Sequence, residues 1–330
     1  MPVRMKDIAR DLGISPMAVS KALRDHKDIG EETKERVKKR AAELNYRMDW
    51  VARSMVTGRT YLVGLVVPDL MQSFFAEIAN ALTAALAPAG YHMVIAHSNE
   101  NAADEAANIE LLVSRKVDGL IIASAQREAR AFKELKTPYI LIDRQVPGLD
   151  ANFVGTRNED IGFLATSHLI EQGCKKIAHL KGPLLSPAEG RLEGYRRALK
   201  KHGLTPLIEE ASHDDAGGYQ AMKRLLRKKP DGVFCFNDPV AAGAMRAILE
   251  ARLSIPRDIA IIGAGNMHFA DMFRIPLSTV DQDTRALGDE AAQLLLAGMA
   301  GKDKPPPRDI VLPPRLIVRA SSRRRQQRRD

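Results

Sequence analysis

The 330-residue chain contains only two cysteines, Cys174 and Cys235, which lie far apart in separate apolar runs. The two cysteines do not have the spacing of a metal site, and the sequence predicts neither a metal nor a cofactor. We expect both cysteines to be buried, reduced thiols. No Ser/His/Asp or Cys/His set is organised by the sequence, which argues against an enzyme.

Long apolar runs are also missing. No segment is apolar enough over about 20 residues to span a membrane. The start, MPVRMKDIARDLG, lacks the basic, apolar and small-residue order of a signal peptide. We therefore expect a soluble cytoplasmic protein with no membrane partner.

The net charge of +9 is unevenly placed. Residues 1–59 hold 14 Lys or Arg against 9 Asp or Glu, whereas residues 60–320 hold 31 of each. Residues 321–330 hold five arginines and one aspartate. A neutral body with a small basic head is typical of a protein whose head touches a polyanion. We expect the basic tail, 321–330, to be disordered and to add only nonspecific affinity.

The stretch GISPMAVSKAL contains a proline where the apolar spacing predicts a helix. Proline is harmless in the first turn of a helix, and Ser15 before it is a good N-cap. One helix should therefore end near 12–13 and another begin at Pro16, forming a helix-turn-helix. A third helix is expected over 30–46, which gives a three-helix head over residues 1–48.

A short hinge helix is expected over 49–59. Asp49 can cap its start and Gly58 can end it, and Trp50 is expected to pack against the head or the core. A helix of about two turns is marginal in water by itself, so this one needs a partner in order to fold.

From residue 61 onward, apolar runs such as YLVGLVVPD and GVFCFND alternate with amphipathic helices. This alternation predicts parallel sheets covered by helices on both faces, in two Rossmann-like α/β lobes of about six strands each. The core should span 60–320, with lobe 1 over about 60–158 plus 284–310 and lobe 2 over about 159–283 plus 311–320. Several crossovers should join the lobes, one of them near STVDQD. Ligands bind such folds beyond the carboxyl ends of the strands.

The motifs of the chain, in their order, resemble the lac repressor (LacI/GalR) family of bacterial transcription regulators. They include KDIARDLGISPMAVSKALR, ELNYRMDWVARSM, RLEGYRRAL, NDPVAAGAMRAI, IPRDIAIIG, PLSTVDQD and LIVRASS. The resemblance implies a DNA-binding head, a hinge helix and a core like the type I periplasmic sugar-binding proteins. It also implies a homodimer, usually a repressor, that binds a near-palindromic double-stranded DNA operator under the control of a small sugar-like effector.

In the family, base readout falls on the two residues after the N-cap and on one a turn later. Here these are Pro16, Met17 and Lys21. The first two can touch thymine methyl groups, and Lys21 can donate to guanine. Ser15 and Ser20 suit phosphate contacts, although Ser15 can instead be only a cap and Met17 can instead only pack.

Two departures from the family concern DNA. Arg4 stands where a threonine often caps the first helix; it cannot cap, but it can contact a phosphate. Met55 stands where the family usually has leucine, whose side chain wedges into the minor groove. Methionine is apolar and flexible enough for this role, or it can pack hinge against hinge.

Polar and aromatic residues near the strand ends are the expected effector contacts. They are Asp69, Phe74, Phe75, Ser124, Asp143, Arg191, His213, Asn237, Asp238 and Asn266. Arg191 matches the effector-binding arginine of the family, and residues 237–238 match its Asn-Asp pair. Carboxylates, an amide and an arginine can bind sugar hydroxyls, while rings stack on the carbon face.

Alternatives exist for several of these residues. The Asn-Asp pair can simply cap the following helix, and Asp143 can pair with Arg144. Many relatives carry an aspartate where this chain has Gly265, followed here by Asn266. A ligand bulkier than a simple hexose, or one with an acidic group, would use the space at Gly265.

Two other functions are weighed against this one. A transport-type sugar-binding protein fits the core but neither the basic head nor the missing signal peptide. A nucleotide-dependent enzyme rests on GAGN alone, a partial glycine motif. The sequence leaves open the effector, the operator and the sign of the response.

Overall fold

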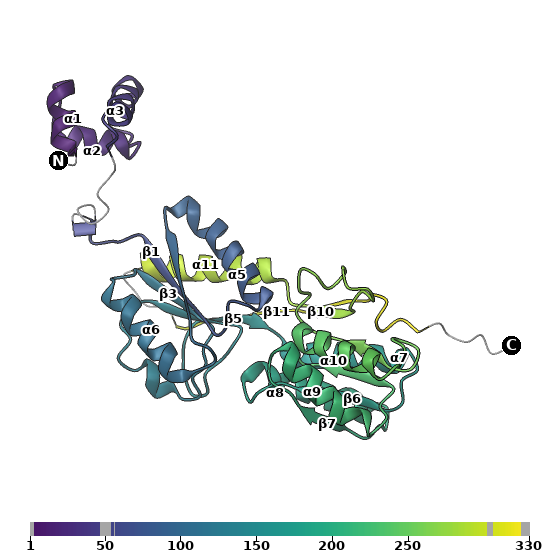
Figure 1. Ribbon diagram of the computed structural model, residues 1–330. Coiled ribbons are helices and arrows are strands. Elements are labelled where there is room, and N and C mark those ends of the chain that lie inside the picture. Colours follow the sequence, from purple (N-terminus) through teal and green to yellow (C-terminus); the bar gives the residue numbers. More distant parts are fainter. Residues whose placement is uncertain (1–2, 47–53, 56, 302–305, 325–330) are drawn as a thin grey trace. The chain divides into compact units, whose positions relative to one another are not determined.

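The computed structural model describes residues 3–46, 54–55, 57–301 and 306–324. It divides into two compact units, residues 1–60 and 61–330. Figure 1 labels the elements of both units.

The first unit contains three helices, α1 (Met5–Leu12), α2 (Pro16–Leu23) and α3 (Glu31–Glu43). The start of α2 is the predicted one, because the Ser15 hydroxyl accepts a hydrogen bond from the Ala18 N–H at 3.1 Å. Gly13 ends α1 with a φ of +67°. The third helix is shorter than the expected 30–46. The small core of this unit consists of Ile8, Ala9, Val19, Ala22, Val37 and Ala41.

Arg4 precedes α1 and makes no side-chain cap, as expected. A side chain from within the helix stabilises the start of α1 instead. The Asp7 carboxylate accepts a hydrogen bond from the Arg4 N–H at 3.0 Å. This bond satisfies one donor at the helix terminus and places a negative charge in the first turn, where the helix dipole favours it.

The described part of the hinge is helical at Ser54, Met55 and Thr57. Its end is at Gly58, the residue expected from the sequence. The Gly58 N–H donates to the Ser54 carbonyl at 2.8 Å, and Gly58 has a φ of +69°. The expected cap at Asp49 and the packing of Trp50 lie outside the described residues.

Lobe 1 is built on a parallel sheet in the order β2-β1-β3-β4-β5-β11. The strands are β1 (Leu62–Val67), β2 (His92–His97), β3 (Gly119–Ile122), β4 (Tyr139–Ile142), β5 (Phe153–Thr156) and β11 (Asp309–Leu312). Helices α5 (Ser73–Leu86) and α11 (Thr284–Ala300) cover one face, and α6 (Ala102–Ser114) covers the other. Two short 3-10 turns, η1 (Ala87–Ala89) and η2 (Ala129–Phe132), complete the lobe.

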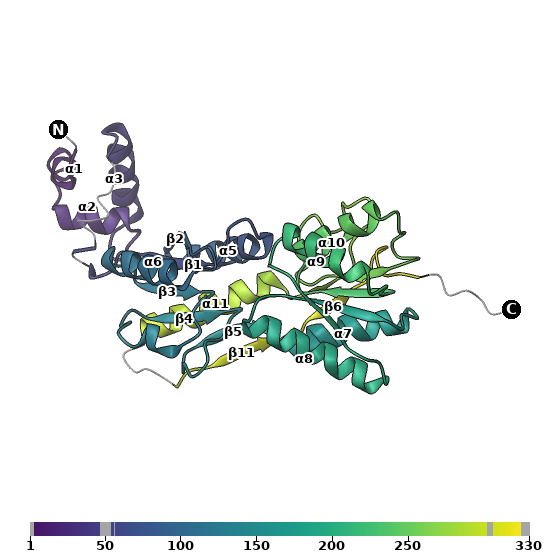
Figure 2. The ribbon, with the colours of Figure 1, turned by 60° about the horizontal axis from the view of Figure 1, so that its bottom comes forward.

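Lobe 2 has a four-stranded parallel sheet in the order β7-β6-β8-β9 and a separate antiparallel pair, β10 with β12. The strands are β6 (Ile177–Lys181), β7 (Leu207–Glu210), β8 (Gly232–Cys235), β9 (Ala260–Ile262), β10 (Thr279–Asp281) and β12 (Arg315–Ile317). Helices α7 (Asn158–Glu171) and α8 (Ser186–Lys201) pack on one face, while α9 (Asp215–Leu226) and α10 (Asp238–Glu250) pack on the other (Figure 2).

Three crossovers join the lobes: from β5 to α7, from β10 to α11, and from β11 to β12. The second crossover lies within STVDQD, as predicted. The third comes slightly later than expected, because the whole of β11 pairs with β5 in lobe 1. Lobe 1 therefore extends through Leu312 rather than to residue 310.

The expectation of a disordered tail over 321–330 is wrong for its first four residues. Ser321 and Ser322 are fully buried. The Ser321 hydroxyl donates to the Ile261 carbonyl at 2.7 Å, and Ser322 bonds to His168 at 2.7 Å. The Arg324 side chain donates to the carbonyls of Pro256, Asp231 and Asp258. These bonds anchor the chain end on lobe 2, which composition alone could not reveal; residues 325–330 lie outside the described part.

Both cysteines are free and buried, as predicted. Burial raises the pKa of Cys174 to about 12 and raises that of Cys235 as well. Thiols with a raised pKa are poor nucleophiles, so neither is a reactive cysteine.

Glycines allow the helix pairs of lobe 2 to touch backbone to backbone. A Cβ added at Gly194 in α8 would lie 1.9 Å from the Glu159 carbonyl oxygen of α7, and one at Gly162 would lie 2.0 Å from the Arg191 carbonyl oxygen. Helices α9 and α10 make the same kind of close contact. A Cβ added at Gly243 in α10 would lie 1.8 Å from the Asp215 carbonyl oxygen of α9. The α7–α8 contact therefore has no room for a methyl group.

We expect Gly194→Ala to lower the free energy of unfolding by about 2 kcal/mol or more, because the methyl group would force the α7 and α8 backbones apart. Gly298→Ala is the matched control. Gly298 also lies within a helix, α11, but nothing approaches its missing Cβ within 4 Å. Gly298→Ala should stabilise by about 0.5–1 kcal/mol through helix propensity. Urea unfolding of both variants measures the difference, and equal effects would contradict the close contact.

Candidate DNA-binding head and effector pocket

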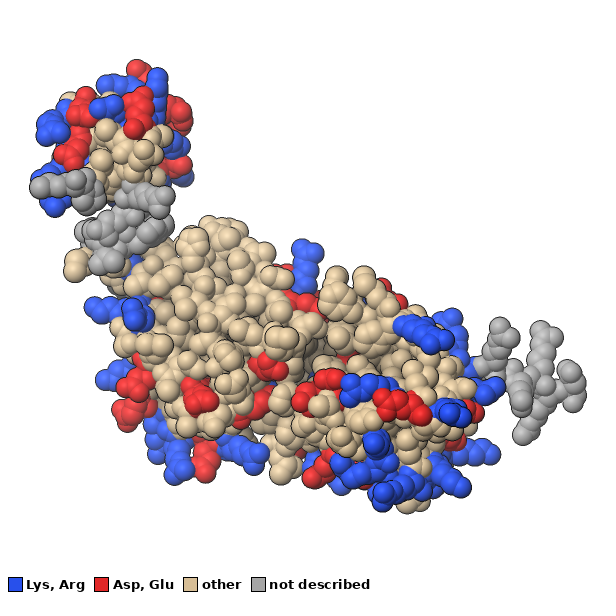
Figure 3. All heavy atoms as spheres, in the orientation of Figure 1, with Lys and Arg blue, Asp and Glu red and all other residues tan. Residues whose placement is uncertain are grey.

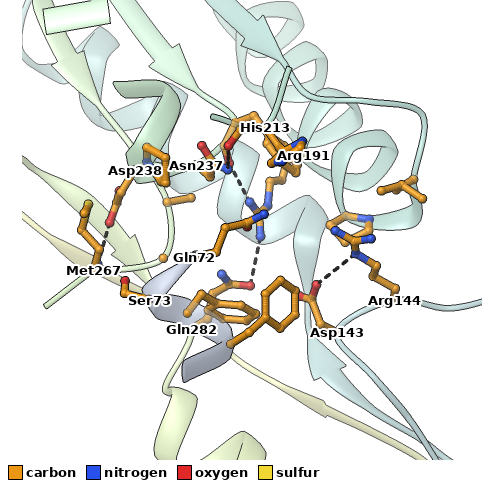
Figure 4. A pocket seen from close by; sticks show the side chains of 18 of the residues that line it. Gln72, Ser73, Asp143, Arg144, Arg191, His213, Asn237, Asp238, Met267 and Gln282 are labelled. Carbon is orange, nitrogen blue, oxygen red and sulfur yellow. Dashed lines mark hydrogen bonds and ion pairs between the residues drawn. The ribbon is translucent and has the colours of Figure 1, made fainter. Parts of the chain in front are cut away.

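A small cavity lies between the two lobes of the second unit, beyond the carboxyl ends of the strands (Figure 4). Its volume is about 50 Å³, room for one or two waters at about 30 Å³ each. The polar lining residues are Gln72, Ser73, Asp143, Arg144, Arg191, His213, Asn237, Asp238 and Gln282. The aromatic ones are Phe74, Phe75 and Phe236.

Arg191 occupies the centre of the pocket. Its guanidinium donates to the Asn158 side chain at 3.0 Å, to the Phe236 carbonyl at 2.6 Å and to the Gln282 side chain at 3.0 Å. It also lies over the Phe236 ring, 4.8 Å from its centroid. Burial lowers the pKa of Arg191 to about 10, so it stays charged at neutral pH. The side chain is therefore fixed by the protein before any ligand arrives.

Asp143 follows β4 with a φ of +64°, a conformation that is uncommon for residues other than glycine. Its carboxylate is buried and receives no hydrogen bond from the described residues. Burial raises its pKa, an effect that Arg144 and Arg191 partly oppose. The pairing with Arg144 considered from the sequence is a long contact of 3.8 Å, because Arg144 instead forms a bidentate pair with Glu100 at 2.6 and 2.7 Å. Asp143 thus offers an acceptor to a ligand.

Asn237 and Asp238 begin α10 but have different roles. The Asn237 side chain caps the helix by accepting from the Val240 N–H at 2.9 Å, so the alternative of a simple cap holds for this residue. Each Asp238 oxygen already accepts one bond, from the Thr279 hydroxyl at 2.7 Å and from the Met267 N–H at 2.8 Å. Burial raises the pKa of Asp238 to about 6. Asp238 is therefore held rigidly, with less free acceptor capacity than Asp143.

Seven of the ten residues expected at the effector site line the cavity. They are Phe74, Phe75, Asp143, Arg191, His213, Asn237 and Asp238. The structure places the other three elsewhere. Asp69 lies beside the cavity, with its carboxylate 3.9 Å from the His213 ring of the other lobe. Ser124 is buried on Glu105 at 2.7 Å, and the Asn266 side chain accepts from Arg319 at 2.9 Å.

Sequence reasoning missed Gln72, Phe236 and Gln282. The positions of Phe236 and Gln282 could have indicated them. Each follows the end of a strand, as the predicted residues Asp143 and Asn237 also do. Gln72 precedes α5 and had no such indication; its side-chain nitrogen is buried without a hydrogen-bond partner among the described residues. That nitrogen is a second group, besides Asp143, that a ligand can satisfy.

The head exposes the start of α2, where the sequence predicts contacts with DNA. Ser15, Pro16 and Met17 are exposed, with Met17 at 65 %. Lys21 is half-buried, and its ammonium lies 3.0 Å from the Asp28 carboxylate. The hydrogen bond from Lys21 and the nearby charge of His26 lower the pKa of Asp28. Lys21 is thus held on Asp28 in the free protein and must exchange this partner to reach a base.

Of the other three expected DNA contacts, Arg4 and Met55 are accessible and Ser20 is half-buried. Arg4 is exposed beside α1. Met55 in the hinge is 82 % exposed, a large apolar side chain that the described residues leave largely uncovered. Ser20 is half-buried, and its carbonyl accepts from the Arg24 side chain at 3.0 Å.

Comparison with known proteins identifies the family. The family model of bacterial regulatory proteins, lacI family, matches residues 4–49, and that of the periplasmic binding protein-like domain matches residues 166–322. The ribose operon repressor of Halalkalibacterium halodurans is 31 % identical over 88 % of this chain and 89 % of that protein. The chain belongs to the lacI family of bacterial regulatory proteins.

Further lacI-family likenesses cover nearly the whole chain. The HTH-type transcriptional repressor PurR of Mannheimia succiniciproducens is 32 % identical over 91 % of this chain and 92 % of that protein. Among solved structures, the lac repressor dimer bound to operator and the anti-inducer ONPF has a TM-score of 0.85 at 27 % identity, covering 98 % of this chain and 99 % of that one. The complex of the regulator CelR with cellobiose has a TM-score of 0.74 at 26 % identity, covering 97 % and 99 %.

Membership of the lacI family confirms the resemblance, the fold and the class of function expected from the sequence. The chain is a DNA-binding transcriptional regulator with an N-terminal helix-turn-helix head and a two-lobed core. No helix in the described part of the chain is long and apolar enough to cross a membrane. The described residues contain no group of His, Cys, Asp or Glu that could hold a metal ion.

The raised pKa of Asp238 predicts a pH dependence of stability. Between about pH 4 and 6 the folded protein binds more protons at this carboxyl than the unfolded chain does, so its contribution to the unfolding free energy falls as the pH rises. Asp238→Asn removes this contribution, and the Thr279 hydroxyl can turn to accept from the new amide. Urea unfolding of both proteins between about pH 4 and 6 measures the difference. The unfolding free energy of the parent chain minus that of Asp238→Asn should decrease as the pH rises.

Asp214 provides a control of opposite sign. The hydrogen bond from the Ser212 hydroxyl lowers its pKa, so its stabilising contribution is present above about pH 4 and is lost as the pH falls further. Asp214→Asn keeps the cap of α9, because asparagine is also a good N-cap. Parallel pH profiles for the two variants would refute the different environments of the two carboxyls.

Proposed function

We propose that this protein is a repressor that binds a near-palindromic operator as a homodimer, and that a small polar effector bound between the lobes changes its affinity for the operator. The proposal rests chiefly on one observation: a fixed guanidinium and an unsatisfied carboxylate face one cavity at the junction of two lobes. The role is regulatory rather than catalytic and is exercised in the cytoplasm, where the operator lies.

DNA readout is assigned to the start of α2. Pro16 and Met17 present apolar surface to thymine methyl groups, and Lys21 donates to guanine after leaving Asp28. Ser15, Ser20 and Arg4 contact phosphates and set the register of the head. The exposed Met55 side chain enters the minor groove at the centre of the operator. The basic charge of the head supports this assignment, because phosphate contacts supply most of the affinity for DNA.

A second copy of the chain is assigned to the free edge of the lobe 1 sheet. β2 has no strand on its outer side among those described, and both of its faces are partly exposed. Val94 and Ile95 are 38 % and 41 % exposed. An exposed apolar edge strand is a liability unless another chain covers it. Pairing two copies along this edge would give an assembly with two heads, one for each half of a near-palindromic operator.

The effector is expected to be neutral or basic. Asp143 and Asp238 face the cavity with one unpaired guanidinium, that of Arg191, because Arg144 is neutralised by Glu100. A ligand with an acidic group would therefore meet net negative charge. Hydroxyl or amino donors on a sugar or amino sugar would satisfy Asp143, and the rings of Phe74 and Phe236 would stack on its carbon face.

A flat nitrogen heterocycle is a second candidate effector. Three phenylalanine rings line the cavity, and Asp143 and the Gln72 amide could bind the edge of such a ring. The sugar class is favoured, because carboxylates and an arginine that converge from several directions suit hydroxyl groups on both faces of a ligand.

The size of the cavity links binding to motion. The space at the centre of the pocket is about 50 Å³, and a larger hollow adjoins it at Pro183, Leu185 and His213. We expect a sugar ring that contacts both Arg191 and Asp143 to change the angle between the lobes. Arg191 bonds to Asn158 and Gln282, which lie at two of the three crossovers. A change in lobe angle would alter the spacing of the two hinges in a dimer, with a coupling of roughly 1–3 kcal/mol.

Operator recognition is tested by Lys21→Ala. Loss of a base contact should lower operator affinity about 5- to 100-fold while nonspecific affinity falls much less, so the ratio of the two falls. Lys38→Ala is the matched control, because Lys38 also lies in the head and is paired with an aspartate, Asp25, at 2.9 Å. Fluorescence anisotropy with operator and scrambled duplexes measures both ratios. If Lys21→Ala leaves the ratio unchanged, α2 does not read bases in the way proposed.

The effector site is tested by Asp143→Asn. A thermal-shift screen of the parent chain with ribose, cellobiose, glucosamine and adenine identifies a compound that raises the melting temperature. That shift should disappear in Asp143→Asn, whereas operator affinity without ligand should stay within about threefold. Asp69→Asn, outside the cavity, is the control and should keep most of the shift. An undiminished shift in Asp143→Asn would mean that the ligand binds elsewhere.

A further inference from the structure

Lobe 2 has a strongly basic surface at the end opposite the pocket. The four parallel strands of lobe 2 begin at this end, and α7 to α10 finish there, whereas the pocket lies where the strands end. We call this surface the basic end. Its exposed cations are Lys175, Lys176, Lys200, Lys201, Arg227, Lys228, Lys229, Arg252, Arg257 and Arg323. Lys and Arg gather on the lower right of lobe 2 in Figure 3.

Few acidic groups on the same segments oppose these charges. Both Asp231 oxygens accept from the backbone N–H groups of Lys175 and Lys176, at 2.8 to 3.1 Å. Asp258 accepts from the Ser254 N–H at 2.7 Å, and Glu250 accepts from the Tyr219 hydroxyl at 2.6 Å. These three carboxylates hold the loops and helices of the lobe. Glu171, exposed at the end of α7, is an acidic side chain of this end that faces solvent.

The cations of the basic end are largely unpaired. Among the described residues, two of the ten have an ion pair: Lys228 with Glu209 at 3.5 Å and Arg257 with Asp258 at 3.5 Å. Lys201 lies 5.9 Å from the centroid of the Phe163 ring, a contact that leaves its charge accessible to solvent. Concentrated like charges of this kind attract a polyanion and gain little for the fold.

Helix capping does not account for the surface. Basic residues complement the dipole at helix C-termini, and those of α8 and α9 do so. However, α5, α6 and α11 of lobe 1 have no basic residue in their last turns. Lys175, Lys176, Arg257 and Arg323 lie in loops beyond any helix. The lobe 1 helices therefore show that the fold does not require basic residues in the last turns of its helices.

The chain end is anchored at the same surface. Arg324 donates to carbonyls of Asp231 and Asp258, which lie in the loops that precede β8 and β9. Beyond this anchor the sequence continues with Arg325, Arg328 and Arg329. The last described residue, Arg324, thus lies at the basic end.

We propose that the basic end binds the phosphate backbone of duplex DNA without reading its sequence. Phosphate contacts need only accessible Lys and Arg, whereas a protein partner usually inserts large apolar anchors. Leu249 is the only exposed large hydrophobic side chain of α7 to α10, all of which the structure describes. Phe163 of α7 lies under Arg197 and Lys201, and no aromatic side chain of α7 to α10 is exposed. Exposed rings for stacking single-stranded bases are therefore missing from these four helices.

This surface goes beyond the proposed function because it provides a second DNA contact in a separate unit from the head. A regulator with its head on an operator could hold another stretch of DNA, or keep the protein near DNA between operator encounters. Each accessible cation that contacts a phosphate adds about one unit to the slope of log affinity against log salt. Binding at the basic end should therefore be strong at low salt and vanish near 0.5 M NaCl.

Lysine footprinting of the full chain tests the proposal by position. The protein is acetylated with an amine-reactive ester in 50 mM NaCl, alone or with a mixed-sequence 30-base-pair duplex, and each lysine is quantified by mass spectrometry. We expect the duplex to protect Lys175, Lys176, Lys200, Lys201 and Lys229 at least threefold, and Lys133 and Lys136 of lobe 1 to stay unchanged. Protection should disappear in 0.5 M NaCl.

The pattern of protection separates this proposal from the proposed function. Protection confined to the head lysines overturns the basic end as a DNA contact and leaves the proposed function intact. Protection of the basic end without that of the head supports the surface, and operator binding by the head is then decided by the Lys21→Ala experiment. A parallel sample contains polyglutamate in place of DNA. Stronger protection of the basic end by polyglutamate than by the duplex would overturn the proposal in favour of an acidic protein partner.

A charge-reversal variant gives a second measurement. Lys175→Glu/Lys200→Glu/Arg227→Glu should weaken binding of the full chain to the mixed-sequence duplex at least fivefold and should reduce the salt slope. The matched control, Arg115→Glu/Lys133→Glu/Lys136→Glu, makes the same change of net charge at exposed positions of lobe 1. Equal weakening by the two variants would show that only net charge matters and would overturn the proposal.

Discussion

The arrangement of the core depends on one buried cation, the Arg191 guanidinium. Removing a charge from water costs several kcal/mol unless hydrogen bonds and opposite charge replace the lost hydration. The protein supplies the replacement with the Asn158 side chain, the Phe236 carbonyl and the Gln282 side chain. Asn158 begins α7 directly after the first crossover and Gln282 lies on the second, so the solvation of one side chain ties together the two connections about which the lobes would turn.

This constraint gives the pocket its asymmetry. Arg191 and Asp238 are largely satisfied by the protein, whereas the Asp143 carboxylate and the Gln72 amide nitrogen are not. Asp143 and Gln72 belong to lobe 1, while Arg191 and Asp238 belong to lobe 2. A ligand therefore finds prepared groups on one lobe and unsatisfied groups on the other, and binding energy gained on lobe 1 can be used to change the angle between them. Such differential contact is what a shift between two lobe arrangements requires.

The sequence predicted those features that depend on local rules. A proline after a serine marks a helix start wherever it occurs, and apolar runs that alternate with helices produce parallel sheets whose carboxyl ends carry the site. It did not predict which strand-end residues face the cavity. Ser124 is taken by Glu105, 19 residues earlier, and the Asn266 side chain is taken by Arg319, 53 residues later. The sequence predicts that Ser321 and Ser322 belong to a disordered tail. In the structure, Ser321 bonds to the Ile261 carbonyl and Ser322 bonds to the His168 ring. These choices are made by side chains brought together only by the fold.

The parallel sheet of lobe 2 also separates two kinds of chemistry. Its strand ends meet the ligand cavity, while its strand starts carry the unpaired cations, so a ligand and a polyanion do not compete for the same residues. They are still connected, because β8 leads from Asp231, which orders the loop of Lys175 and Lys176, to Phe236, whose carbonyl holds Arg191. A strand is stiff along its length, and both ends of β8 are fixed by hydrogen bonds. A change of lobe angle at Arg191 would therefore move the basic end with lobe 2 as a rigid body and leave its surface unaltered, so an effector can act on DNA through the hinge and head without weakening a phosphate contact at the far end.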